Sequence, residues 1–240
     1  TVNAAWMPSD SLRDRDRGRF AFSGYHDIDS HWQARASVGW VSDTRYVEDF
    51  ANRLAGISAS YLQSNAGVYG VGQHWTAGVM AEHYQLTDYT LTNDNLPYSR
   101  LPRAYLNWEQ PLGHWLDAGV WAEAVRFEHR ESAGGTRLDV KPYLTARLAG
   151  PAWYITPTLA WRHTAYQLDH QLAQQLGGGN SPSRSLPITT LDAGVYFDRD
   201  TTIDGQAYLH TLEPRLFYLN APYRAQAGLP LPVRLRRRAR

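Results

Sequence analysis

Apolar and polar side chains alternate at every second residue over long stretches of this sequence. Between Trp32 and Trp40, apolar residues occupy the even positions, and polar or small residues occupy the odd positions. The same alternation runs through Arg137–Leu148. A β-strand places successive side chains on opposite faces, so each stretch predicts a strand with one apolar face and one polar face. We therefore expect an all-β, antiparallel fold.

The alternation predicts about eleven strands, several of them longer than the ~5–6 residues typical of soluble sheets. A tilted strand needs about 9–11 residues to cross a bilayer, so this length favours a transmembrane β-barrel. The expected strands lie near residues 18–27, 31–41, 54–64, 66–72, 74–86, 102–111, 115–129, 137–148, 152–167, 188–200 and 207–219.

The polar faces of the expected strands carry ionic side chains, which a dry protein core would not accept without partners. A wide barrel turns its apolar residues toward lipid and its charged residues toward a wet lumen. A soluble sandwich with one solvated face would give a similar alternation, so strand length is the main distinction. The charged residues in question are Arg35, Arg137, Asp139, Lys141, Arg147 and Arg162.

The connections between the expected strands fall into two kinds. Residues 111–114 and 149–151 predict tight turns, whereas residues 87–100 and 167–187 predict long polar loops. Short turns that alternate with long loops are typical of outer-membrane barrels. The 15 Tyr and 9 Trp outnumber the 6 Phe, a bias that suits surfaces in contact with both lipid and water.

Several classes of protein are disfavoured by composition. The net charge of +1 does not indicate a nucleic-acid partner, and the absence of cysteine excludes disulfides and thiolate metal sites within the sequence. No stretch approaches the ~18 consecutive apolar residues of a membrane helix. The start, Thr1–Trp6, lacks the pattern of a signal peptide, so we expect a processed or truncated secreted protein.

No arrangement of residues indicates an enzyme or a bound cofactor. The nine histidines are scattered and form no compact ligand spacing. His74, His83, His163 and His210 lie within expected strands, where we predict packing rather than metal binding. The sequence also has no Gly-x-Ser-x-Gly, so we expect no catalytic residue, no cofactor and no metal.

Three segments resemble motifs of the LptD family of lipopolysaccharide-assembly proteins, and they occur in the family's order. Residues 211–224 read TLEPRLFYLNAPYR and resemble its T-L-E-P-R-x-x-Y-L-x-x-P-Y-R segment. Residues 41–50, VSDTRYVEDF, resemble V-S-D-x-x-Y-x-x-D-F, and residues 96–102, LPYSRLP, resemble P-Y-x-R-L-P. The first motif is fairly specific by itself, and the three together are a strong signal.

The resemblance implies a component of the Gram-negative outer-membrane translocon that places lipopolysaccharide in the outer leaflet. Acyl chains would leave through a lateral opening between strands, while sugars pass through the lumen. It further implies an LptE-type lipoprotein plug, an LptA-type periplasmic bridge that reaches the family's N-terminal domain, and contact with outer-membrane lipid. A general porin or passive channel is the alternative function, and a soluble β carbohydrate-binding module is a third.

The resemblance also divides the chain. Residues 1–17 are expected to be a lead-in from a missing periplasmic domain, and residues 18–231 to be the first part of an LptD-type barrel. Residues 232–240 are rich in Arg and depart from the family, so we expect a non-native tail that results from a frameshift or an assembly artefact.

Three residues are candidate functional residues. Glu213 and Arg215 lie two positions apart, so they share a strand face, and we expect a lumenal network or a salt-bridge lattice there. The first strand is expected to begin near Arg17–Phe20, which would place Pro8 at the seam of the closed barrel. Because proline has no N–H to donate, Pro8 would either weaken a lateral gate or simply end the connector.

Overall fold

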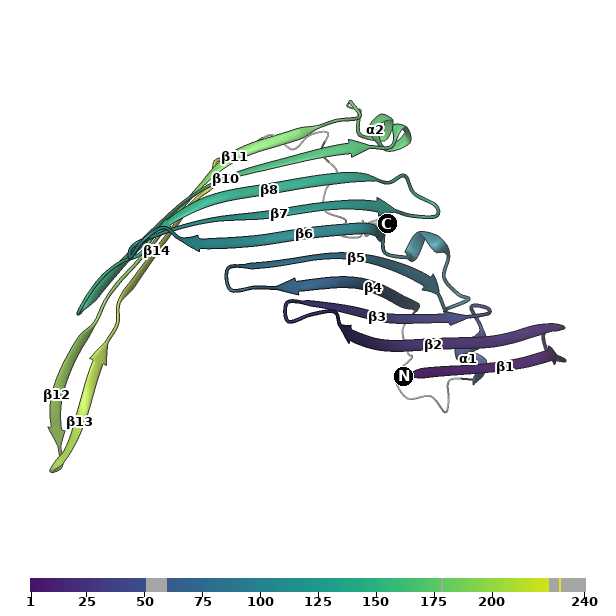
Figure 1. Cartoon of the computed structure of the whole chain (residues 1–240), viewed down its shortest axis with the longest axis horizontal. Helices are drawn as coiled ribbons and strands as arrows, with labels where there is room; N and C mark the ends of the chain where they lie inside the picture. The colour runs from purple at the N-terminus through teal and green to yellow at the C-terminus, as the bar shows by residue number, and fades with distance from the viewer. Residues whose placement is uncertain (51–59, 178, 225–228, 230–240) are drawn as a thin grey trace.

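The computed structural model describes residues 1–50, 60–177, 179–224 and 229 of the chain. Its main feature is an open, curved, 12-stranded sheet in which neighbouring strands run antiparallel (Figure 1). Almost every strand pairs with the next one along the chain. The strands of this sheet are β1 Val2–Asp10, β2 Arg15–Asp27, β3 Trp32–Val41, β4 Tyr61–Val71, β5 Trp75–Leu86, β6 Ser99–Pro111, β7 Leu116–Glu128, β8 Gly135–Ala146, β9 Leu148–Gly150, β10 Trp153–Leu168, β11 Ser183–Val195 and β14 Arg215–Asn220.

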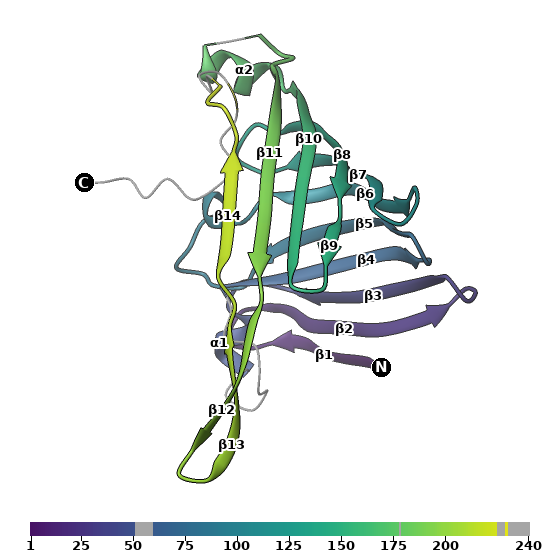
Figure 2. The ribbon, with the colours of Figure 1, turned by 90° about the vertical axis from the view of Figure 1, so that its left-hand side faces the viewer.

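A separate two-stranded sheet interrupts this order between β11 and β14. It consists of β12, Phe197–Ile203, and β13, Gln206–Leu212, which continue the long hairpin beyond the main sheet (Figure 2). Within the described residues, helical structure is confined to the short elements α1, Tyr46–Phe50, η2, Asn93–Asn95, and α2, His170–Leu176. None of these helices is long and apolar enough to span a membrane.

The two ends of the sheet differ in their connections. The segments that contain α1, η2 and α2 all lie at one end, which we call the long-loop end (Figure 1). Short turns join β2 to β3, β4 to β5 and β6 to β7 at the other end, which we call the short-turn end. The predicted alternation of turns and loops is therefore present, with the hairpin β12–β13 and the turn between β1 and β2 as additions.

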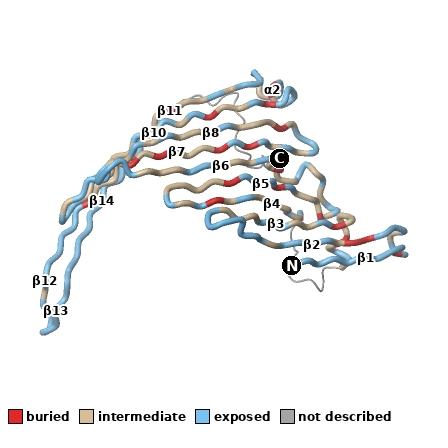
Figure 3. The backbone as a smooth tube through the Cα atoms, in the orientation of Figure 1, coloured by how far each residue is buried: buried red, intermediate tan, exposed pale blue. Residues whose placement is uncertain are grey.

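No second layer of structure covers the sheet in the described part of the chain, and buried residues are sparse along it (Figure 3). Large apolar side chains are consequently exposed; Leu159 is 60% exposed and Trp161 is 51% exposed. Burying apolar surface is worth about 25 cal/mol per Å², so a soluble protein would cover this face. Bilayer lipid would cover it equally well, which favours a membrane wall over a soluble carbohydrate-binding module.

The predicted fold class is confirmed, but the start of the first strand was predicted wrongly. Residues 1–17 are not an unpaired lead-in, because Val2–Asp10 form β1 and pair with β2. The register places Val2 opposite Phe22 and Asp10 opposite Arg15. The charged residues 10–17, which suggested a connector, instead form the end of β1, the turn and the first part of β2.

Two other strand boundaries were also predicted wrongly. The stretches 54–64 and 66–72 were predicted as separate strands, yet residues 61–71 form one strand, because Asn65 continues the ladder opposite Glu82; residues 54–59 lie outside the described residues. The predicted strands 188–200 and 207–219 are each divided in two. Pro214 lacks an N–H and separates β13 from β14, since it cannot donate to the ladder.

Candidate functional site

The two faces of the sheet differ in chemistry, as the alternation predicted. The register places Glu123 opposite both Tyr105 and Asp139, so these polar side chains share one face, which we call the charged face. In β8, Leu138, Val140 and Leu144 point to the other, apolar face, whereas Asp139, Lys141 and Tyr143 point to the charged face. In β3, likewise, Trp32, Ala36, Val38 and Trp40 lie on the apolar face, opposite to Arg35 and Ser37.

Arginine–carboxylate pairs join neighbouring strands across the charged face. Glu123 on β7 accepts hydrogen bonds from Arg103 on β6 at 2.5 Å and from Arg137 on β8 at 2.5 Å, and its side chain is only 7% exposed. Charge-assisted pairs of this kind are strong and hold strands in register. The other pairs on this face are Arg100–Glu82 at 2.6 Å, Arg162–Asp139 at 2.5 Å, Arg147–Glu109 at 2.8 Å, Arg147–Asp117, and Arg215–Asp192 at 2.6 Å.

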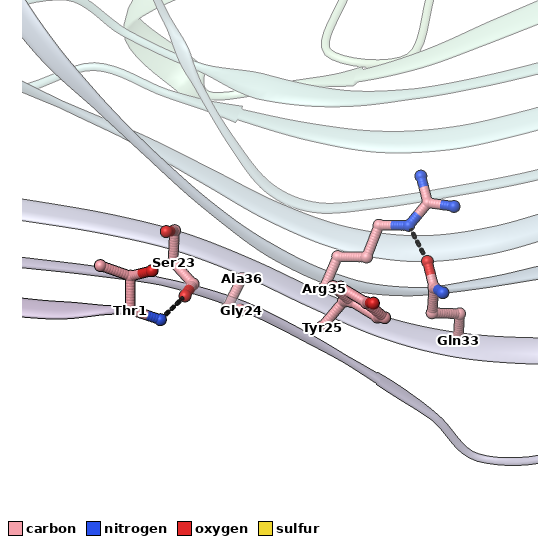
Figure 4. Close-up of a pocket in the computed structure, with 7 residues that line it drawn as sticks. All are labelled: Thr1, Ser23, Gly24, Tyr25, Gln33, Arg35 and Ala36. Carbon is pink, nitrogen blue, oxygen red and sulfur yellow. Dashed lines mark hydrogen bonds between the residues drawn. The ribbon is translucent and has the colours of Figure 1, made fainter.

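Four cationic side chains on the charged face of the described strands form no ion pair: Arg19, Arg35, Lys141 and Arg184. The ammonium nitrogen of Lys141 lies 5.9 Å from the centre of the Tyr143 ring. The Arg35 guanidinium lies 5.3 Å from the Tyr69 ring and donates to Gln33 (Figure 4). The strand carboxylates from β5 to β11 on this face all have arginine partners, so the four cations without an ion pair leave an excess of positive charge there.

An open pocket adjoins Arg35 at the first strands of the sheet (Figure 4). Its lining includes Gln33 and Arg35 from β3 and Ser23 and Tyr25 from β2. The pocket is a shallow part of the sheet surface rather than an enclosed cavity. Among the described residues, no group of three or more His, Asp or Glu side chains is arranged to hold a metal ion.

The structure separates Glu213 from Arg215. Arg215 begins β14 and forms a bidentate pair with Asp192 on β11, with nitrogen–oxygen distances of 2.7 and 2.6 Å. Glu213 lies between β13 and β14, is exposed, and is not part of a strand. Arg215 therefore takes part in the arginine–carboxylate pairing, while the predicted shared strand face does not extend to Glu213.

A second charged site lies at the long-loop end, where Arg17 is only 1% exposed. The Arg17 guanidinium donates to Asp10 at 2.9 Å, to Asp43 at 2.9 Å and to Asp49 at 2.7 Å. These three carboxylates come from β1, from the segment after β3 and from α1. One buried cation therefore ties three separate parts of the chain to β2.

Aromatic rings complete the environment of Arg17. Its guanidinium carbon lies 5.6 Å from the centre of the Tyr46 ring and 4.7 Å from the centre of the Phe50 ring, within the range of cation–π attraction. We call Arg17, Asp10, Asp43, Asp49, Tyr46 and Phe50 the Arg17 cluster. The motif at residues 41–50 supplies four of its members, so its acidic and aromatic positions have a structural purpose that spacing alone did not reveal.

Asp43 has an unusual acidity for a loop carboxyl group. Burial by itself would raise its pKa, but hydrogen bonds from Ser42 and Arg17 hold the pKa below the ordinary value of 3.8. Asp43 is therefore negatively charged at neutral pH and forms a stable ion pair with Arg17. The Oδ1 atom of Asp43 also accepts a hydrogen bond from the backbone N–H of Arg45, which holds residues 42–45 in a tight turn.

The motif at residues 96–102 also fastens a loop to the sheet. The Tyr98 hydroxyl donates to the Ala133 carbonyl at 3.1 Å, which joins the segment before β6 to the loop after β7. Arg100 pairs with Glu82, which the Tyr84 hydroxyl also contacts at 2.6 Å. Each of the three family-like motifs therefore contributes at least one charged residue that joins neighbouring segments.

Pro8 lies inside β1 rather than in a connector. The register between β1 and β2 shifts between Met7 and Asp10, so Pro8 falls in the irregular part of this ladder. Ser9, the next residue, has a positive φ of 53°. β1 is also an edge strand of the sheet, so Pro8 coincides with a local defect in the pairing of that edge.

Tryptophans mark the short-turn end of the apolar face. Trp32, Trp75 and Trp153 are the first residues of β3, β5 and β10. The rings of Trp32 and Trp75 lie 5.3 Å apart. We call these three residues the Trp belt. Aromatic girdles of this kind lie at the interface between the hydrocarbon and the water in outer-membrane barrels.

Comparisons with known proteins identify one family. The profile of the family described as "LptD: LPS transport system D" matches residues 15–232. The chain is 53% identical over 251 residues to a protein named "LPS-assembly protein LptD" from Xylella fastidiosa strain Temecula1, and 53% identical over 266 residues to one of the same name from Xanthomonas oryzae pv. oryzae. These matches cover 96% of the chain but only 32% and 33% of the relatives, so the chain spans about a third of their length.

Removal of Arg17 is expected to destabilise the long-loop end strongly. In the full-length protein, Arg17→Ala would leave Asp10, Asp43 and Asp49 without their shared cation, at a cost of about 3–5 kcal/mol. The temperature at which the folded form is lost on a heat-modifiability gel measures the effect.

Arg126→Ala is the matched control for this substitution. It removes a pair with Glu128 in which both side chains are about half exposed, worth roughly 0–1 kcal/mol. Equal losses of thermal stability in the two variants would show that the Arg17 cluster stabilises the protein no more than an exposed ion pair does.

The long-loop end is also expected to loosen in acid. A carboxyl group whose pKa is depressed on folding stabilises the fold above its unfolded pKa, and this contribution disappears as the pH falls through the lower folded pKa. Hydrogen exchange at residues 42–50, corrected for intrinsic rates, should therefore change little from pH 7 to pH 5 and accelerate below 3.8. The acceleration should be smaller in Asp43→Asn; an identical response in that variant would contradict the assignment to Asp43.

Proposed function

This chain belongs to the LptD family, and we propose from that premise that its full-length protein inserts lipopolysaccharide into the outer leaflet of the Gram-negative outer membrane. The observation that carries the proposal is the continuous antiparallel wall, with its charged face and its apolar face, in a chain of this family. Residues 18–231 are then the first part of the barrel, and β1 extends the wall further toward the N-terminus.

The two faces suit the two chemistries of the substrate. The apolar face would contact outer-membrane lipid, and the charged face would line the wet lumen through which the sugars pass. Lys141 and Arg35, which form no ion pair in the described part of the chain, would attract the anionic groups of the substrate. The step is physical transfer rather than covalent chemistry, so the proposed function is not enzymatic.

The edges of the sheet support a place for this wall within a larger barrel. Lipid offers no hydrogen-bonding partner to the unpaired backbone of an edge strand, so β1 and β14 both require further strands. The relatives are about three times as long as the chain, which leaves ample sequence for those strands. An LptE-type lipoprotein in the lumen and an LptA-type periplasmic bridge complete the proposed translocon on the basis of the family resemblance.

Pro8 supports a lateral opening at β1. Its missing N–H and the shift in register beside it weaken the pairing of the edge strand that would form the seam of the closed barrel. Each absent ladder bond lowers the cost of opening by about 0.5–1.5 kcal/mol. In this proposal, the acyl chains of lipopolysaccharide enter the bilayer through that seam.

Residues 232–240 are rich in Arg, and they lie outside the residues that the structure describes. We propose that this segment is non-native, and the end of the family match at residue 232 supports this view. Sequencing of the gene around the codon for Pro232 tests it. A neighbouring frame should encode further alternating strands, whereas an in-frame stop with no such coding downstream would overturn the idea.

Depletion of the full-length protein in its own bacterium tests the proposed function. Newly made lipopolysaccharide should stop reaching the cell surface, while the uptake of small hydrophilic solutes by the intact cells should not fall. A general porin predicts the opposite pair of results, with reduced solute uptake and normal surface lipopolysaccharide, and that outcome would contradict the proposal.

Replacement of Pro8 tests the lateral opening separately. Pro8→Ala in the full-length protein restores a ladder donor at the seam, so surface delivery of lipopolysaccharide should slow while the amount of folded protein stays the same. Pro111→Ala, at the end of β6 and away from β1, should leave delivery unchanged. Normal delivery in Pro8→Ala would leave Pro8 as a structural residue of an irregular edge strand.

A further inference from the structure

The hairpin β12–β13 extends beyond the rest of the molecule at the short-turn end (Figures 1 and 2). Its ladder runs from Phe197 opposite Leu212 to Ile203 opposite Gln206, and it pairs with no other described strand. All of its strand residues except Thr201 are exposed (Figure 3). The hairpin is therefore a projecting arm rather than part of the wall.

The Trp belt places this arm outside the hydrocarbon layer. Trp153 belongs to the belt, and its register partner on β11 is Val195, the last residue of that strand. Phe197 and the residues that follow it therefore lie beyond the belt. The seven residues of β12 rise about 3.3 Å each, so the arm extends roughly 23 Å farther, into water.

The two faces of the arm differ in their content of large apolar side chains. The strand register groups Phe197, Ile203, Tyr208 and Leu212, each between 49% and 63% exposed, on one face, which also carries Arg199, Thr201, Gln206 and His210. We call it the apolar face of the arm. The opposite face carries Asp198, Asp200, Thr202, Ala207 and Thr211, with Leu209 as its one large apolar residue. A two-stranded hairpin is only marginally stable in water without packing on one face, so the apolar face requires a covering segment.

The direction of β1 indicates where such a segment comes from. Because β1 begins toward the short-turn end and runs to Asp10 at the long-loop end, any segment that precedes Thr1 in the full-length protein enters from the side of the arm. The chain spans only about a third of the length of its relatives, so a large part of the full-length protein lies outside it.

The free edges of the arm indicate what kind of segment fits. In a closed barrel, the next strand would pair with the free edge of β14, and the free edge of β13 continues that same edge. The outer edge of β12 would still have unpaired backbone groups, and such an edge can pair with an added β-strand. We propose that β12–β13 is a docking arm, and that a β-structured segment preceding Thr1 in the full-length protein packs on its apolar face and pairs with β12.

This inference goes beyond the proposed function, because it concerns how the wall holds another part of the same polypeptide. It would fix the orientation of that part beneath the barrel lumen whether the barrel carries lipopolysaccharide or another solute.

Photocrosslinking in the full-length protein, in its native membrane, tests the docking arm. A photoreactive phenylalanine derivative replaces Tyr208 on the apolar face or, as the control, Thr202 on the acidic face. We expect mass spectrometry to identify adducts with a peptide that precedes Thr1, at several-fold higher yield from position 208 than from position 202. Adducts mainly with downstream strands, with another protein or with lipid would overturn the proposal, as would equal yields from both faces.

A second pair of variants separates docking from general unfolding. With the photoreactive residue at position 203, Tyr208→Asp should reduce the same adduct several-fold, because it puts a charge into the covered face. Thr202→Asp should leave the yield unchanged, and both variants should keep the heat-modifiable form of the folded barrel. A yield that neither substitution alters would show that the apolar face of the arm is not the contact surface.

Discussion

The backbone hydrogen bonds between adjacent strands are the interaction on which the rest of the structure depends. In a bilayer no water is available to an unpaired N–H or C=O group, so a spanning chain must satisfy these groups in a helix or in a closed ladder of strands. The ladder fixes the register, and the register fixes which side chains share a face. The charged face, the apolar face and the Trp belt all follow from that one arrangement.

Ion pairs between neighbouring strands allow many charged side chains to lie together on one face of the sheet. Glu123 with Arg103 and Arg137 shows the principle, since a carboxylate that is nearly buried between two guanidinium groups links three strands. The Arg17 cluster applies the same chemistry to loops, where one buried cation holds three acidic residues from separate segments. Cations without such partners lie on the same surface and remain available to anions.

Side-chain alternation was sufficient to predict most of the strands and the faces of their residues, because period two is a property of every strand. It could not predict β1, since Pro8 and the charged residues 10–17 resemble a connector when the partner strand is unknown. The Arg17 cluster was also missed, because its members are brought together by tertiary structure rather than by spacing. The motif at residues 41–50 was the available signal, and it did not indicate Arg17 as the shared partner. Of the two residues predicted to share a strand face, Arg215 pairs with Asp192, whereas Glu213 lies outside any strand because Pro214 separates β13 from β14.

The central claim is that this sheet is one wall of a transmembrane barrel with a wet charged face, and a cysteine scan along β8 tests it most directly. The chain has no cysteine of its own, so each substitution adds one thiol to this region. In the full-length protein in the outer membrane, a small water-soluble thiol reagent should modify cysteines at positions 139, 141, 143 and 145 and should spare those at 138, 140 and 144. Uniform modification, or modification of the second set instead of the first, would contradict the account.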